Sequence, residues 1–196
     1  MFIQVIQGKT SRPEELRSLA ESWETEGGAG AVGWLGGTYG VTDDGDFLGV
    51  IRFASRDEAM QNSARPETGE FAEKMGAVMD GDVQFHDCDD VTTWLDGGSD
   101  KAGFVQVIRG RADDPAPLKA LMSNTDDLKE MRPEIIGGTL AIAGDGTFFE
   151  TVYFTDEESA RKGEQLEPPA EIRDELESMM AGASFYDLRQ PWFQSA

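Results

Sequence analysis

The side chain best suited to acid or base chemistry is Glu150, which lies in an expected strand among apolar neighbours. It alternates with Phe148, Val152 and Phe154 and should therefore face an apolar interior. Burial raises the pKa of a carboxyl group, and such a carboxylate can serve as a general base. The structural alternative is an ion pair with Arg109 on the neighbouring strand. We treat Glu150 as a candidate catalytic residue.

The single histidine, His86, is the second catalytic candidate. It lies in the run His86-Asp87-Cys88-Asp89-Asp90, in which each side chain could bind a metal. On a strand, however, His86 and Cys88 face one way and Asp87 the other, so the donors do not converge. The structural alternative is a strand end that runs into an acidic loop. No nucleophile motif accompanies His86, and we predict no metal and no cofactor.

Six further residues are candidates for ligand binding. They are Trp34, Tyr39, Arg52, Asn62, Arg65 and Gln106. All but Arg52 and Gln106 occur only in the first half of the chain, where they could form an aromatic pocket with a polar group. Gln106 has a counterpart, Gln4, and each glutamine could hold a ligand carbonyl. For the four residues of the first half, the structural alternative is core packing and capping. For Arg52 it is a side chain that extends to solvent. For the two glutamines it is a hydrogen bond inside the fold.

The composition excludes several partners. The chain of 196 residues has 38 acidic and 17 basic residues, which give a net charge of −21. It therefore has no basic stripe for nucleic acid and no attraction to an anionic membrane. No apolar run is long enough to span a bilayer, and no secretory signal is seen. The one cysteine, Cys88, suits a reducing compartment, so we expect a cytoplasmic, acidic protein.

The chain contains a tandem repeat. Residues 2–9 (FIQVIQGK) and 104–111 (FVQVIRGR) are identical at five of eight positions. A second pair of segments, 36–53 and 137–154, shares Gly-Gly-Thr, an Asp-Gly turn and a final phenylalanine. This self-similarity predicts two similar structural units. We expect one repeat at 1–95, a polar linker at 96–102 and a second repeat at 103–196.

Each repeat has the pattern of a β-α-β-β-α-β unit. In the first repeat we expect strands at 2–8, 31–41, 47–53 and 83–88, with helices that begin after capping motifs at Ser11 and Ser55. In the second, Thr155 should cap a helix, and Ile172, Leu176, Met179 and Met180 form an apolar helical stripe. The linker follows Trp94, and we expect Trp94 and Trp192 to dock a C-terminal tail.

The first strand is apolar on both faces, which indicates a sheet that is covered on both sides. Helices in a ferredoxin-like unit cover one face only, so the other repeat is the obvious cover. The sequence therefore predicts an α+β fold of two tandem ferredoxin-like (βαββαβ) repeats that form an intramolecular dimeric α/β barrel.

With these motifs the sequence resembles the dimeric α/β-barrel superfamily, in particular the antibiotic-biosynthesis-type monooxygenases. It is also similar to two-copy actinobacterial proteins of unassigned function. The resemblance covers nearly the whole chain. It implies a group that includes cofactor-free oxygenases of aromatic polyketides, haem enzymes and isomerases. The haem branches place an iron-binding histidine on a helix. His86 is expected on a strand with Asp187 as its counterpart, so a haem enzyme is not expected.

Two functions remain open at this point. The first is a cofactor-independent, monooxygenase-like enzyme or binder that acts on a small aromatic or apolar molecule in a dry pocket. The second is a non-catalytic binding or protein-interaction module with a packed barrel. An open apolar cavity with converging polar groups would favour the first, and a packed interior the second. The chain is expected to be a self-contained pseudo-dimer, and further association into a homodimer is left open.

Overall fold

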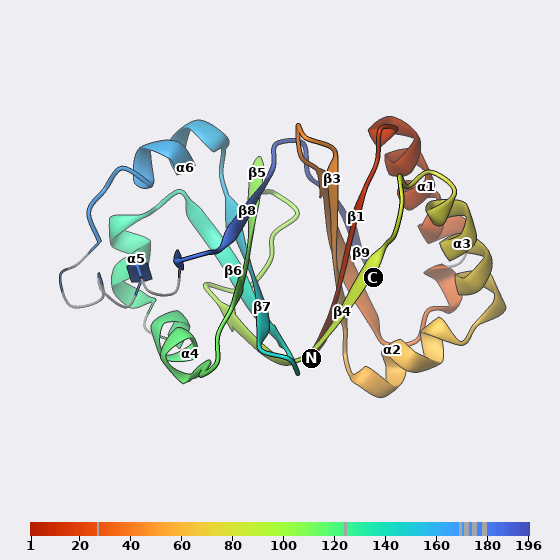
Figure 1. Ribbon diagram of the computed structural model, residues 1–196, viewed down its shortest axis with the longest axis horizontal. Helices are drawn as coiled ribbons and strands as arrows, with labels where there is room; N and C mark the ends of the chain where they lie inside the picture. Colours follow the sequence, from red (N-terminus) through yellow and green to blue (C-terminus); the bar gives the residue numbers. More distant parts are fainter. Residues whose placement is uncertain (27, 124, 169, 171–172, 174–175, 178–179) are drawn as a thin grey trace. The chain divides into compact units, whose positions relative to one another are not determined.

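The computed structural model describes residues 1–26, 28–123, 125–168, 170, 173, 176–177 and 180–196. These residues form two compact units: unit 1 comprises residues 1–89 and 191–196, and unit 2 comprises residues 90–190. Figure 1 shows the elements of both. The elements of the first half are β1 (Phe2–Lys9), α1 (Pro13–Glu26), η1 (Gly28–Gly30), β2 (Trp34–Val41), β3 (Asp46–Phe53), α2 (Arg56–Ser63), α3 (Pro66–Gly76) and β4 (Gln84–Trp94). Those of the second half are β5 (Phe104–Arg111), α4 (Ala116–Ser123), α5 (Asp126–Met131), β6 (Ile135–Ala143), β7 (Thr147–Phe154), α6 (Glu157–Gly163), β8 (Ser184–Leu188) and β9 (Trp192–Ser195).

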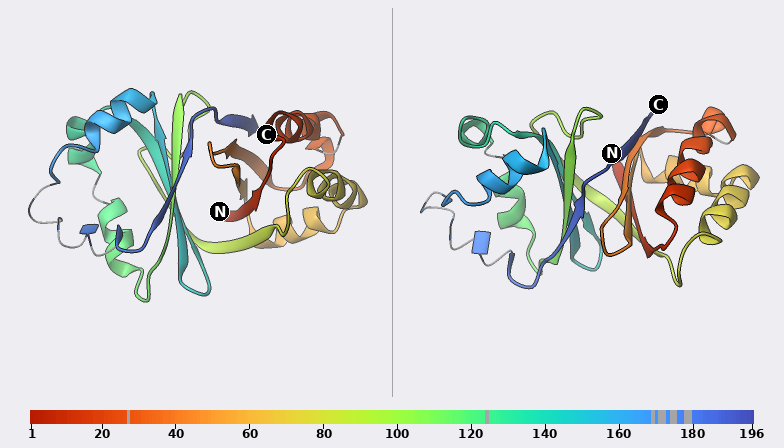
Figure 2. Two further views of the ribbon diagram at one scale, coloured as in Figure 1. Left: turned by 45° about the horizontal axis from the view of Figure 1, so that its top comes forward. Right: turned by 90° about the horizontal axis from the view of Figure 1, so that it is seen from above.

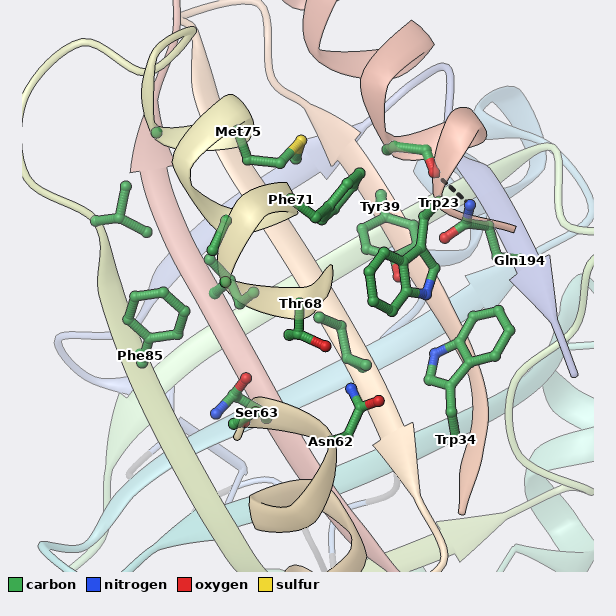
Figure 3. Close-up of a pocket in the computed structure, with 18 of the residues that line it drawn as sticks. Trp23, Trp34, Tyr39, Asn62, Ser63, Thr68, Phe71, Met75, Phe85 and Gln194 are labelled. Atoms are coloured by element: carbon green, nitrogen blue, oxygen red, sulfur yellow. Dashed lines mark hydrogen bonds between the residues drawn. The ribbon is translucent and has the colours of Figure 1, made fainter. Parts of the chain in front are cut away.

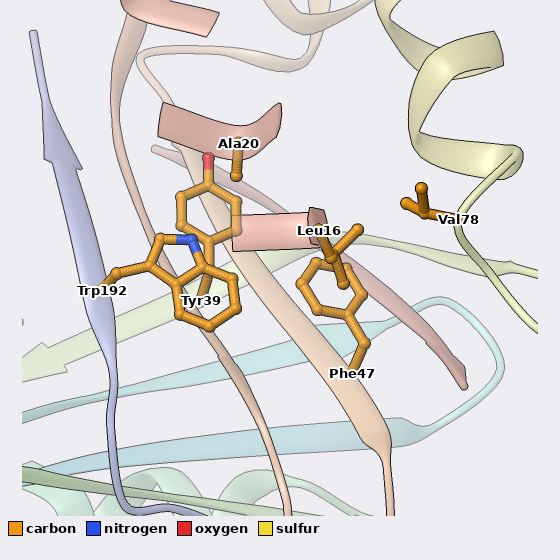
Figure 4. Close-up of a cluster of buried hydrophobic side chains, with 6 residues drawn as sticks. All are labelled: Leu16, Ala20, Tyr39, Phe47, Val78 and Trp192. Atoms are coloured by element: carbon orange, nitrogen blue, oxygen red, sulfur yellow. The ribbon is translucent and has the colours of Figure 1, made fainter. Parts of the chain in front are cut away.

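Unit 1 is an antiparallel sheet with helices on one face. Its strand order is β4-β1-β3-β2-β9, and α1, α2 and α3 lie on the same side of the sheet (Figures 1 and 2). The core on that side is built from Leu16, Ala20, Tyr39, Phe47, Val78 and Trp192 (Figure 4). On the opposite face of β1, Ile3 and Val5 are also buried. The prediction that this strand is covered on both faces is therefore confirmed.

Unit 2 repeats the same arrangement. Its strands follow the order β8-β5-β7-β6, and the end of β4 lies beside β6. Leu118 of α4 packs on Ile108, Leu140 and Phe148 of the sheet. The predicted fold class, α+β with two tandem ferredoxin-like repeats, is confirmed. Of the predicted helical stripe, Ile172 and Met179 lie outside the described residues.

Strand β4 is longer than predicted. It continues past Cys88 to Trp94, so Asp89 and Asp90 lie within a strand instead of an acidic loop. The last residues of β4 pair in unit 2, where Trp94 packs against Phe104 and other core residues. Hydrogen bonding and packing thus outweigh the low strand preference of aspartate. As a result, the compact units divide inside β4, whereas the repeats of the sequence were expected to meet at the linker 96–102.

The C-terminal strand β9 belongs to unit 1. It pairs antiparallel with β2, where Tyr39 faces Trp192 and Gly37 faces Gln194. The Trp192 and Tyr39 rings stack with centroids 6.2 Å apart and an interplanar angle of 13°. The expectation that Trp192 docks a C-terminal tail is confirmed, while Trp94 lies in a strand of unit 2.

The predicted cap at Ser55 is confirmed, and the one predicted at Thr155 is shifted by one residue. Ser55 caps α2 by accepting a hydrogen bond from the backbone N–H of Glu58 at 3.2 Å. In the second repeat the cap is Asp156, not Thr155, because its carboxylate accepts from the backbone N–H of Ser159 at 2.8 Å. Pro66 begins α3 as its first residue, where its missing N–H leaves no bond unmade.

Candidate functional site

Unit 1 contains a cavity of about 470 Å³ between its sheet and helices α1, α2 and α3 (Figure 3). Its aromatic lining residues are Trp23, Trp34, Tyr39, Phe47, Phe53, Phe71 and Phe85. Its lining residues with polar side chains besides tyrosine and tryptophan are Gln4, Asn62, Ser63, Thr68 and Gln194. Ligand pockets of this volume are typically apolar with a few placed polar groups. The cavity therefore has the size and lining of a small-molecule site.

Aromatic rings from five elements, two helices and three strands, form its walls. Trp23 of α1 and Phe71 of α3 lie with ring centroids 4.8 Å apart at an angle of 51°. Tyr39 of β2 lies over Gly37, where any Cβ atom would overlap the tyrosine ring. Glycine at this position is thus what allows the ring to lie flat along the sheet. Such ring surfaces favour planar, apolar ligands.

The polar end of the cavity lies where α2 meets α3 (Figure 3). Asn62 is 5% exposed, and its Oδ1 accepts a hydrogen bond from Nη1 of Arg65 at 3.2 Å. Because a guanidinium can only donate, this contact fixes the amide so that Nδ2 remains a donor. Within the described part of the chain, neither Asn62 Nδ2 nor the buried Oγ1 of Thr68 has a hydrogen-bond partner. Both groups could donate to a ligand oxygen.

The cavity wall is electrically neutral. Among the described residues that line it there is no aspartate, glutamate, histidine, lysine or arginine. The nearest charge in the hydrogen-bond network is Arg65, which bonds to Asn62 and lies 3.8 Å from Glu67. A cation behind the amide polarises it and strengthens Nδ2 as a donor. The site therefore suits an uncharged ligand that carries a hydrogen-bond acceptor.

The structure brings together part of the predicted ligand set. Trp34, Tyr39 and Asn62 line the cavity, and Arg65 supports Asn62 from behind. These four residues occur only in the first repeat, and they do gather around one site.

The glutamines of the two repeats form internal hydrogen bonds. Gln106 lies in unit 2, where its Nε2 donates to Asp187 at 3.0 Å and to Glu164 at 3.4 Å. In unit 1, Nε2 of Gln4 donates to Asp87 at 2.9 Å. The structural alternative proposed for these side chains is therefore confirmed, although Gln4 also lines the cavity.

Arg52 and His86 lie on the other face of the unit 1 sheet. Arg52 is opposite Ile3 in the β1–β3 register, and its Nη1 donates to Oγ1 of Thr38 at 3.4 Å. His86 is opposite Val5 in the β1–β4 register. Ile3 and Val5 point away from the helices, because alternate residues of a strand face opposite sides. Neither candidate is among the residues that line the cavity.

The predicted counterpart of His86 in the second repeat is wrong. Gln4 pairs with Asp87 and Gln106 pairs with Asp187, so the two aspartates are equivalent. The residue equivalent to His86 is Tyr186, opposite Val107. The offset between the repeats is 100 residues here, because the intervening helical segments differ in length.

Glu150 lies in the core of unit 2, on the face of the sheet that α4 covers. It is 6% exposed and stands between Ile108 and Leu140 in the strand register. Burial raises its pKa from 4.5 to about 7. Arg109 pairs with Phe149, one position further along, and so points to the opposite face. The predicted ion pair between Glu150 and Arg109 is therefore wrong.

The described residues contain neither a metal-binding cluster nor a helix that could span a membrane. No group of three or more histidine, cysteine, aspartate or glutamate side chains is placed to hold a metal ion there. No helix in that part of the chain is long and apolar enough to cross a membrane.

Solved structures share this fold over the full length of the chain. A candidate monooxygenase from Fusobacterium nucleatum matches with a TM-score of 0.72 and 10% identity, and covers 100% of this chain and 95% of that one. One from Lactobacillus acidophilus gives 0.69 and 15%, with 100% and 97% covered. An anthrone oxidase-like protein gives 0.69 and 14%, with 100% and 93% covered. The sequence matches no protein-family model and no curated protein.

At these identities the comparisons establish the fold. The predicted resemblance to monooxygenase-like proteins with tandem ferredoxin-like repeats is confirmed at that level. The evidence for the cavity comes from the side chains of this chain and not from these comparisons.

Several lining residues were not predicted as site residues. Phe71 and Met75 lie four residues apart in α3, so their spacing indicates only an apolar helix face, and that face lines the cavity. Thr68 carried no signal in the sequence. Gln194 lies in a four-residue strand whose partner, β2, is distant in the chain, and so no local pattern could place it.

Proposed function

We propose that this protein binds a small, uncharged, planar aromatic molecule in the cavity of unit 1. The observation that carries the proposal is the cavity itself: about 470 Å³, lined by aromatic rings and neutral, with two hydrogen-bond donors at one end. Apolar burial would supply most of the affinity, and the donors would orient a ligand carbonyl or phenol oxygen. A packed, ligand-free interaction module is the weaker candidate, because unit 1 is not filled by its own side chains.

We further propose that binding leads to cofactor-independent oxygenation. The fold is that of proteins described as monooxygenases, one of them anthrone oxidase-like. In such chemistry the ionised ligand itself gives electrons to oxygen, and the protein contributes a dry, oriented site. Donors from Asn62 and Thr68 would stabilise the negative charge on the ligand oxygen.

Hydrogen-bond donors of the protein, and not a protein base, would promote ionisation of the ligand. Glu150 belongs to unit 2 and His86 to the other face of the unit 1 sheet, so neither touches the cavity. Hydrogen bonds to an anionic oxygen lower the pKa of the group that carries it. A ligand with an acidic C–H next to a carbonyl would thus lose its proton to water more readily when bound. We place the protein in the cytoplasm, which its single, buried Cys88 supports.

Replacing Asn62 by leucine is expected to weaken the binding of 2-acetonaphthone about tenfold, which corresponds to about 1.4 kcal/mol. The side chain keeps its volume but loses the donor. Binding can be followed by quenching of tryptophan fluorescence, because Trp23 and Trp34 line the cavity. Ser63→Ala is the matched control, since Ser63 lines the cavity but its hydroxyl donates to the Ala59 carbonyl at 3.0 Å. Equal affinities of wild type and Asn62→Leu would contradict the proposed role.

Oxygenation has a separate test with anthrone as substrate. Oxygen uptake that matches anthraquinone formation, and that falls in Asn62→Leu, would support the enzyme. Binding of anthrone without oxygen uptake above the buffer rate would contradict the enzymatic activity and support a binding protein. No binding of either aromatic ketone would shift support to the interaction module.

A further inference from the structure

The C-terminal strand contributes a buried amide to the cavity. Gln194 of β9 is 3% exposed and lines the cavity (Figure 3). It stands opposite Gly37 in the β2–β9 register. Trp192, two residues earlier, points to the same face and stacks on Tyr39.

The orientation of this amide is fixed by its partner. Nε2 of Gln194 donates to the backbone carbonyl of Ala20 in α1. Only the nitrogen of an amide can donate to a carbonyl, so Oε1 must be the free end of the group. Among the described residues no donor reaches this oxygen. An acceptor that lines the cavity without a protein partner can accept a hydrogen bond from a ligand donor.

Two buried amides therefore present opposite groups to one cavity. Asn62, anchored through its oxygen by Arg65, offers N–H. Gln194, anchored through its nitrogen by Ala20, offers C=O. We propose that Gln194 is a specificity-determining residue whose Oε1 accepts a hydrogen bond from a ligand hydroxyl. The ligand class is then an aromatic ketone that also carries a hydroxyl group. This inference rests on the proposed function and narrows its ligand.

A second glutamine in the cavity provides the matched control. Gln4 also lines the cavity and is also anchored through its nitrogen, by Asp87. Unlike Gln194, it is only half-buried, so its amide is more exposed to water. The hydroxyl preference is therefore assigned to Gln194 alone, and the Gln4→Met variant should retain it.

The test compares three probes on the full chain. They are 2-acetonaphthone, its 6-hydroxy derivative and its 6-methoxy derivative, with dissociation constants from tryptophan quenching. The methoxy group keeps the oxygen but cannot donate. In the wild type we expect the hydroxy ketone to bind about tenfold more tightly than the other two. In Gln194→Met we expect the three constants to agree within about twofold, while Gln4→Met and Asn62→Leu keep the preference.

Each outcome bears on the proposal. If no probe binds, the proposed function fails and the inference fails with it. If the probes bind with no hydroxyl preference in the wild type, the inference alone is wrong, and this result needs no variant to fold. A preference that survives in Gln194→Met, or disappears in Gln4→Met, would also overturn it. Circular dichroism and melting temperature confirm that each variant is folded.

Discussion

Replacing Gly137 by alanine is expected to lower the free energy of unfolding by about 3 kcal/mol or more. Gly137 lies in β6, beneath the loop that follows β4. A Cβ atom there would overlap the carbonyl oxygen of Gly97 and lie 2.8 Å from that of Leu95. These obstacles are backbone atoms, and the loop is held by consecutive residues with positive φ, 46° at Leu95 and 79° at Gly97. The loop must therefore shift as a whole to admit a methyl group.

Thermal denaturation followed by circular dichroism measures this effect. For a chain of this size the loss should lower the melting temperature by about 6–12 °C. Gly144→Ala is the control, because nothing lies within 4 Å of a Cβ atom at that position. Gly137→Ala and Gly144→Ala melting at the same temperature would show that the loop does not lie on β6 as described.

Replacing Glu150 by glutamine is expected to stabilise the protein at pH 8 and to have little effect at pH 4. The pKa of Glu150 rises from 4.5 to about 7 because burial disfavours the carboxylate. The folded state therefore holds the proton more tightly than the unfolded state. Its contribution to stability is complete below pH 4.5 and is lost as the pH rises to about 7. The full difference corresponds to about 3 kcal/mol.

Urea denaturation of wild type and Glu150→Gln from pH 4 to pH 8 tests this linkage. The difference between the two proteins should grow with pH and level off above pH 7, whereas other carboxylates cancel in the comparison. Glu158→Gln serves as the control, since the Glu158 side chain is 80% exposed. A difference that stays constant over the pH range would mean that Glu150 is not buried as a carboxyl group in the folded state.

The sequence predicted the features that depend on local pattern. The repeat of residues 2–9 at 104–111 and the Asp-Gly turns placed the strands of both hairpins to within a few residues. The end of β4 was missed, because Asp89 and Asp90 have low strand preference and only pairing within the sheet overrides it. The short α5 (Asp126–Met131) was missed as well, since it has no apolar stripe.

Alternation along a strand predicts which residues share a face, but not which face the helices cover. For this reason Arg52 was predicted to bind a ligand, yet it lies on the face of the sheet opposite to the cavity. Asn62 and Trp34 were found from their occurrence in one repeat only. Gln194 required the pairing of β9 with β2, which joins residues far apart in the chain. Burial and anchoring of an amide are properties of the folded state, and no sequence pattern encodes them.

The presence of both repeats in one chain has a genetic consequence. In an assembly of two identical chains, every substitution appears at both equivalent positions. Here the position of Gly49 in unit 1 is occupied by Glu150 in unit 2. A side chain at Gly49 would approach the rings of Tyr39 and Phe47 to about 3.2 Å, whereas Glu150 stands beside Leu140. Because both repeats lie in one chain, a substitution changes one repeat alone. One repeat can therefore keep a cavity while the other evolves under different selection.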